Sequence, residues 1–250
     1  MTTKNQNQNS LSAFSSASLP FSAAAAALAK PRTDNDRGYA SRLQFISTGS
    51  SKLATSGQVK IGSYALVNGE KVVDLGKEVV VVPLGRLDKA IDFSSGDDTI
   101  VAFGEGTPEY EKIKAEVVKD GFDSGCMYGP VFLCYEVSSG QFVELFLNNV
   151  SGRNEAENIN EFLPVSVEAS DAHFEATGDR VEARAPRAAR LGSKEVTSKR
   201  GKKTYIYNVP TTAEGGPLNV AAPPTTERLQ AAFANFFKQA EPKEAETRDR

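Results

Sequence analysis

The strongest concentration of chemically distinctive side chains in this sequence is a basic segment between residues 180 and 203. It holds nine basic and two acidic residues, a local net charge of +7, whereas the whole chain carries −3 at pH 7. Cations gathered in this way neutralise phosphates and release their counterions. The segment therefore predicts contact with a phosphate backbone. Its basic residues are Arg180, Arg184, Arg187, Arg190, Lys194, Lys199, Arg200, Lys202 and Lys203.

Two tyrosines follow this segment at alternate positions. Residues 193–199 and 203–209 have the alternation of a β-hairpin, turning at residues 200–202, and Tyr205 and Tyr207 share a face with Val209. Aromatic rings on such a hairpin can stack bases while cations follow the phosphates. We expect single-stranded DNA to bind at Arg184, Arg187, Arg190, Lys194, Lys199, Arg200, Lys202, Lys203, Tyr205 and Tyr207.

An alternative for the same region stays open. The cations could only solvate a loop while the tyrosines belong to the core. The placement of Tyr64, Tyr205 and Tyr207 decides between the two. Rings that line an exposed groove beside the arginines favour nucleic-acid binding, and buried rings do not.

No other group of residues indicates catalysis or a cofactor. His173 has no neighbouring Cys or Ser partner, and with Cys126 and Cys134 it is short of the ligands of a zinc site. The Gly-Glu-Gly at residues 104–106 lacks the third glycine of a dinucleotide site. We expect a protein that is not an enzyme and that holds no metal or cofactor.

The elements that must position the hairpin are short β-strands. The most apolar are residues 131–137 and 141–147, which predict a central hairpin, and residues 78–84, which predict a strand buried on both faces. Thr107-Pro108 predicts a helix to about residue 119. The pattern is mainly β with minor α, and indicates a small OB-like barrel or half-open barrel with one capping helix.

Four local predictions follow from turn and strand signals. Pro83 cannot donate a ladder hydrogen bond, so its strand should leave the sheet or lie at an edge. Residues 48–57 are expected to form a loop, and residues 59–67 a β segment. Val165 to Val167, with Phe174 and Val181, indicate one or two further strands.

The termini differ from the middle in composition. Residues 1–38 are expected to be a disordered arm, 39–210 the globular domain, 211–224 a linker, 225–239 an amphipathic helix and 240–250 a disordered tail. The helix carries an apolar stripe that could dock on its own core, pair with a second copy, or enter a partner's groove. The stripe is Leu229, Phe233, Phe236 and Phe237.

The composition also bears on location. No run approaches the roughly 18 apolar residues of a membrane span, so we expect no membrane partner. Two cysteines make no disulfide framework and favour free thiols in a reducing compartment, the cytoplasm, or the host cytoplasm if the chain is viral.

The low-complexity Asn/Ser/Ala arm and the β-rich core together resemble uncharacterised proteins of tailed phages. The resemblance rests on composition and layout, and no residue role comes with it. It adds an alternative to nucleic-acid binding, a viral structural or assembly protein that uses its arm and terminal helix for subunit contacts.

Overall fold

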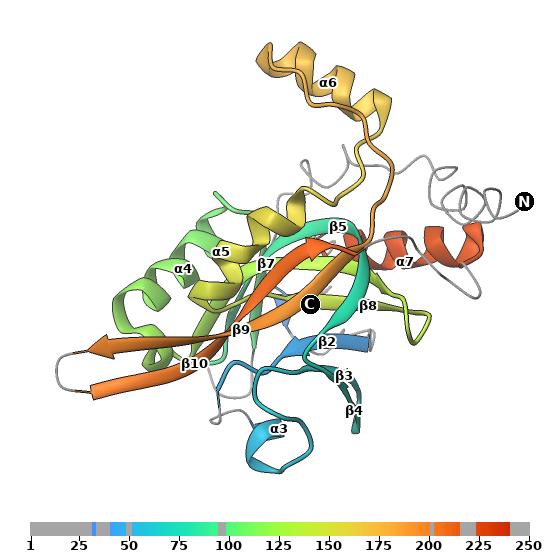
Figure 1. The fold of residues 1–250 in the computed structure, drawn as a ribbon. Helices are drawn as coiled ribbons and strands as arrows, with labels where there is room; N and C mark the ends of the chain where they lie inside the picture. Colours follow the sequence, from blue (N-terminus) through green and yellow to red (C-terminus); the bar gives the residue numbers. More distant parts are fainter. Residues whose placement is uncertain are drawn as a thin grey trace, which may run out of the picture.

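The computed structural model describes residues 32–33, 41–48, 52–94, 99–200, 203–215 and 224–240. Most of these residues belong to one curled sheet, the half-open barrel of Figure 1. Its strands are β1 (Arg32–Thr33), β2 (Ser41–Phe45), β3 (Tyr64–Asn68), β4 (Lys71–Gly76), β5 (Val79–Asp92), β6 (Ile100–Phe103), β7 (Cys126–Glu136), β8 (Gln141–Phe146), β9 (Ala189–Arg200) and β10 (Lys203–Glu214). The helices are α3 (Lys52–Thr55), α4 (Pro108–Asp120), α5 (Val150–Asn160), α6 (Val167–Thr177) and α7 (Thr226–Lys238).

The long strand β5 organises the sheet. The strand order is β1-β6-β5-β7-β8-β2-β3-β4, and β9, which carries β10, pairs with β5 as well. Along one edge β5 pairs with β7. Its other edge is shared, because Val79–Val81 pair with β9 and Lys89–Asp92 pair with β6. Between these two pairings β5 curves strongly, and the sheet curls with it (Figure 1).

Pro83 lies between the β9 and β6 pairings, where β5 is paired only with β7 among the described strands. The expected departure from the sheet does not occur, because β5 runs on to Asp92, but the other edge of the strand is unpaired at Pro83, which agrees with the expected edge position. Pro83 is opposite Cys134 and Gly85 is opposite Leu133, so Leu84 is the extra residue of a bulge. The bulge interrupts the ladder with β7 and the other edge is unpaired here, which is why the missing N–H of Pro83 is tolerated.

The sheet is covered on both faces, and the mainly β, half-open character expected from the sequence is confirmed. Val131, Leu133 and Tyr135 of β7 face the buried side chains of α7, whereas the alternating Phe132 and Cys134 face α5. Helix α4 packs on the α5 face, against β5 and β7. Three helices rather than one therefore cap the sheet. The described strands form one 10-stranded sheet, and this strand order does not by itself assign the OB-like arrangement.

Helix α7 docks on its own chain. Leu229, Phe233 and Phe236 are buried in the cluster that includes Leu84 and Leu133. Phe237 approaches Gly85 so closely that a Cβ there would lie 2.9 Å from the Phe237 ring. This is the first of the three arrangements considered for the apolar stripe.

Both strong hairpins predicted from the sequence are present. Residues 131–137 and 141–147 correspond to β7 and β8, whose turn is held by the buried carboxylate of Glu136. It accepts hydrogen bonds from the backbone N–H groups of Ser138 and Ser139, at 2.9 and 2.7 Å. The hairpin predicted at residues 193–209 is the part of β9 and β10 nearer the turn.

Several local predictions are wrong. Residues 52–55 of the expected loop form α3, and of residues 59–67 only those from Tyr64 onward form a strand. Val167 and Phe174 lie in α6, not in strands. The sequence does hold signals for this helix. Ser166 is its N-cap and accepts a hydrogen bond from the Ala169 N–H, and Gly178 ends it with φ of 79°. The strand prediction followed the apolar residues and gave these two capping residues no weight.

The predictions for the ends of the chain lie mostly outside the described residues, namely residues 1–31 and 34–38 of the arm, 216–223 of the linker and the tail from 241. Strand β10 runs to Glu214, so residues 211–214 belong to the sheet. Among the described helices, none has the length and apolarity needed to cross a membrane.

Candidate nucleic-acid interface

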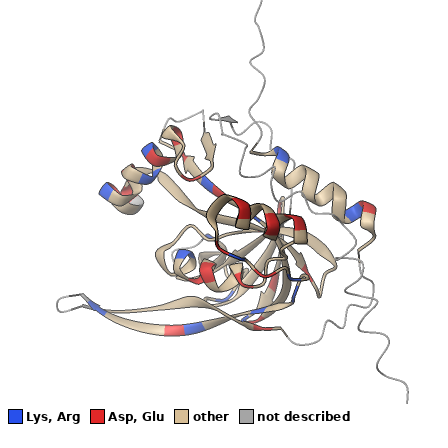
Figure 2. Cartoon of the chain, turned by 90° about the horizontal axis from the view of Figure 1, so that it is seen from above, with Lys and Arg blue, Asp and Glu red and all other residues tan. Residues whose placement is uncertain are grey.

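The β9–β10 hairpin projects from the body of the protein. The strands pair over their whole length, from Lys203 opposite Arg200 to Glu214 opposite Ala189, but β9 joins the sheet only through Ala189–Leu191. Figure 1 shows the ribbon leaving the body, and Figure 2 shows basic positions near its end. Among the described residues, the hydrogen bond to the body that lies nearest the tip is the one that the Asn208 N–H donates to the Ser47 carbonyl at 3.1 Å. Five residues beyond that point span about 17 Å of free ribbon.

The register sorts the side chains of this ribbon onto two faces. Directly opposed residues share a face, and successive residues alternate. One face carries Lys194, Val196 and Ser198 with Tyr205, Tyr207 and Val209. The other carries Glu195, Thr197 and Lys199 with Thr204, Ile206 and Asn208. Both tyrosines therefore share a face with Lys194, and the acidic Glu195 lies on the opposite face.

The three tyrosines whose exposure tests the nucleic-acid interpretation differ in their placement. Tyr64 is buried with 1% of its surface exposed, so it lines no groove. Tyr205 is 46% exposed and Tyr207 is half-buried. Ile206, on the opposite face, is 64% exposed. Sequence reasoning missed Ile206, although the same alternation that paired the tyrosines places it outward.

Three of the predicted basic residues are available for a ligand. Arg190, Lys194 and Lys199 are exposed. Within the described part of the chain their side chains make no ion pair or hydrogen bond. Lys202 lies outside the described residues, and the structure gives only the backbone pairing of Arg200 and Lys203.

Arg184 and Arg187 lie elsewhere and are engaged in the fold. Arg184 donates from Nε to the Leu163 carbonyl at 2.7 Å and from Nη2 to the Asn160 carbonyl at 2.9 Å. Arg187 donates to the Glu161 carbonyl and lies over the Phe162 ring at 5.0 Å. The Asn160 carbonyl belongs to the last residue of α5 and the other two follow it, at the C-terminal end of the helix, where cations are favoured. The structure does not bring these two arginines to the tyrosines.

Other candidate groups do not form a second chemical site among the described residues. No group of three or more His, Cys, Asp or Glu side chains gathers there in a way that could hold a metal ion. Both cysteines are free thiols. Burial, together with a hydrogen bond to Asp92, raises the pKa of Cys126 to about 11, so this thiol is a poor nucleophile at neutral pH.

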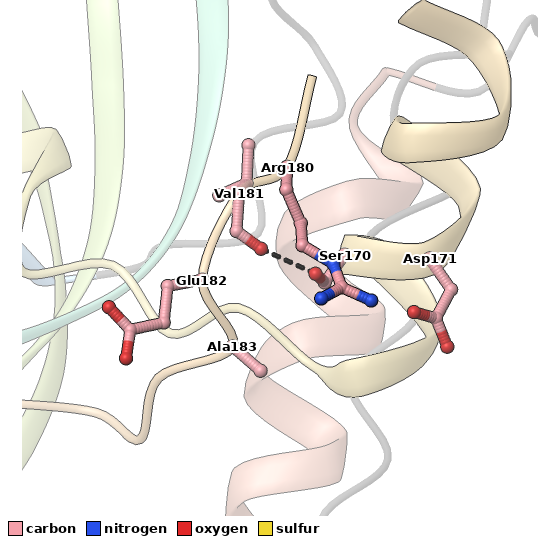
Figure 3. Close-up of a pocket in the computed structure, with 6 residues that line it drawn as sticks. All are labelled: Ser170, Asp171, Arg180, Val181, Glu182 and Ala183. Atoms are coloured by element: carbon pink, nitrogen blue, oxygen red, sulfur yellow. Dashed lines mark hydrogen bonds between the residues drawn. The ribbon is translucent and has the colours of Figure 1, made fainter. Parts of the chain in front are cut away.

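A hollow of about 270 Å³ lies between α6 and the segment after it (Figure 3). Ser170 donates from its hydroxyl to the Val181 carbonyl, and this bond ties the helix to that segment. Arg180 lies at the same place, but its guanidinium also sits over the Phe174 ring at 5.7 Å. The hollow is open and built from one short stretch of chain, so it presents no converging catalytic groups.

Comparison of the chain with protein-family models, with curated proteins and with solved structures found no match.

Proposed function

We propose that the chain is a non-enzymatic protein that binds single-stranded nucleic acid, most favourably DNA, through its projecting β9–β10 hairpin. The observation that carries the proposal is the register, which puts Lys194, Tyr205 and Tyr207 on one face. The paired Arg200 and Lys203 continue the basic character toward the tip. Neither Lys194 nor Lys199 forms an ion pair with a described Asp or Glu, so the charges of both lysines are available to phosphates.

Spacing favours a single strand over a duplex. Residues two apart in a strand are about 7 Å apart, whereas bases in duplex DNA rise by about 3.4 Å per strand. Tyr205 and Tyr207 therefore cannot follow successive stacked bases of a duplex. An extended strand with separated bases suits them better, because each ring can stack on one base.

We do not propose assembly through the terminal helix, because its apolar residues Leu229, Phe233 and Phe236 are buried in the chain's own core. The free thiols support a reducing setting for the proposed function. We infer the cytoplasm, that of the host cell if the chain is viral.

The test is the affinity for a fluorescent oligothymidylate, measured by anisotropy between low and moderate salt. With up to six hairpin cations involved, the slope of log affinity against log salt should reach about −4. The double variant Lys194→Gln, Lys199→Gln should reduce the magnitude of that slope by about 1.4. Tyr205→Ala should weaken binding about 10-fold by removing one stacking ring.

A matched control removes the same charge elsewhere. Lys71→Gln, Lys112→Gln changes two exposed lysines that lie outside the hairpin, in β4 and α4, and should leave affinity and slope unchanged. Absence of binding at low salt, or equal losses in the two double variants, would contradict the proposal.

A further inference from the structure

Helix α6 is a second projecting element, separate from the hairpin. It stands above the body in Figure 1, while the hairpin extends from the lower part, so one molecule does not bring them together. Within α6 only Ser170 is buried. Val167 and Phe174 are 61% and 48% exposed. An isolated helix of eleven residues is marginal in water, and its stability here has little packing to support it.

The exposed side of α6 combines apolar and acidic residues. Val167 and Phe174 are seven positions apart and share a face, with Asp171 between them. Glu175 follows Asp171 by four positions, so the two carboxylates adjoin the apolar pair. From residue 167 to 179 the chain has four acidic residues and no Lys or Arg. The surface therefore suits a partner that is basic and carries exposed apolar side chains.

The β9–β10 hairpin has those properties. From Arg190 to Lys203 it holds six basic residues and one acidic residue. It exposes Tyr205 and Ile206, an aromatic and an aliphatic side chain. The ring of Phe174 already has a guanidinium over it, that of Arg180 at 5.7 Å, so this surface accommodates a cation beside an aromatic face.

We propose that α6 of one copy binds the β9–β10 hairpin of a second copy. The two surfaces are different, so the contact is heterologous and produces rings or open chains rather than a closed symmetric pair. Opposite charge speeds encounter and makes the association sensitive to salt. The inference uses the hairpin that also carries the proposed function, but it does not require that hairpin to bind nucleic acid.

Charge reversal tests this pairing. The α6 variant Asp171→Lys, Glu175→Lys and the hairpin variant Lys194→Glu, Lys199→Glu change only exposed side chains. Analytical ultracentrifugation should show concentration-dependent association of the wild type that weakens with salt. Each variant alone should be a monomer. An equimolar mixture of the two should associate again, because the reversed α6 meets the reversed hairpin and the two unreversed surfaces still match.

Circular dichroism and thermal unfolding establish that both variants are folded. Phe174→Ala, which leaves the charges unchanged, should weaken association at least 10-fold. A wild type that is monomeric at every concentration, or a mixture that fails to associate, would overturn the inference.

Oligonucleotide binding separates the two proposals. The α6 variant should keep the wild-type affinity for oligothymidylate, since it retains the hairpin. Association without oligonucleotide binding would remove the proposed function alone. Oligonucleotide binding by a protein that never associates would remove this inference alone.

Discussion

The hydroxyl of Tyr64 in β3 donates a 2.9 Å hydrogen bond to the carbonyl oxygen of Gly192 in β9. Gly192 is the first residue of β9 beyond the three that pair with β5. The bond therefore fastens the hairpin at the point where it leaves the sheet. It joins two strands that are not neighbours in the strand order.

Removing this hydroxyl should loosen the base of the hairpin. Tyr64→Phe is expected to lower the free energy of unfolding by about 1 kcal/mol, the usual net contribution of a hydrogen bond. Urea denaturation measures the change. Tyr110→Phe is the control, because that hydroxyl makes no hydrogen bond within the described residues. Equal losses in the two variants would show that the Gly192 bond contributes nothing specific.

Stability should fall at alkaline pH. Burial raises the pKa of Tyr64 above its ordinary 10.0 and the pKa of Cys134 above its ordinary 9.0. Between the unfolded and folded pKa values the unfolded chain loses these protons and the folded protein keeps them. The free energy of unfolding should therefore be constant below about pH 8 and decline above about pH 9. Urea denaturation from pH 7 to 11 checks this, and Tyr64→Phe should show a shallower decline above pH 10.

The predicted basic residues should divide into structural and binding groups. Arg184→Gln removes donors to two carbonyls at and just after the end of α5 and should cost about 1–3 kcal/mol of stability, with oligonucleotide affinity unchanged. Lys194→Gln should change stability by less than about 0.5 kcal/mol and should weaken binding. Thermal unfolding and anisotropy on the same two variants separate these effects. A loss of binding without a loss of stability in Arg184→Gln would place that arginine at the interface instead.

Helix α7 should stabilise the whole domain. Phe236→Ala empties a buried position against the sheet and should lower the free energy of unfolding by about 3–5 kcal/mol. Asn235→Ala, one residue away on the exposed side of the helix, should change it by less than about 0.5 kcal/mol. Denaturation curves measure both. A small effect of Phe236→Ala would indicate that the helix detaches readily and that its apolar side is available to other partners.

Local patterns in the sequence were sufficient for the elements that are locally determined. The β7–β8 and β9–β10 hairpins, α4 with its Thr107-Pro108 start, and α7 with its apolar stripe were all predicted. The continuation of the strand through residues 85–92 was expected as well. The pairing of one edge of β5 with both β6 and β9 was not, because those strands come from distant parts of the chain.

The sequence predicted the residues on the hairpin correctly, but it also assigned to the candidate site two arginines that lie elsewhere. Alternation gave the shared face of Tyr205 and Tyr207, because a strand has a fixed period of two. Arg184 and Arg187 were grouped with the hairpin by their proximity in the sequence. Their actual partners, the carbonyls at the end of α5, are more than twenty residues away in the chain, and charge density alone cannot reveal such contacts.

The single short ladder that joins β9 to β5 has a consequence for local opening. Beyond Asn208 the hairpin is held mainly by its own cross-strand hydrogen bonds, and a two-stranded ribbon alone is marginally stable in water. Its outer half can therefore open without unfolding the sheet. Native-state hydrogen exchange should be much faster at the ladder amides of residues 204–207 than at those of residues 131–135. Any partner that binds the outer half of the hairpin should therefore slow hydrogen exchange there more than elsewhere in the fold.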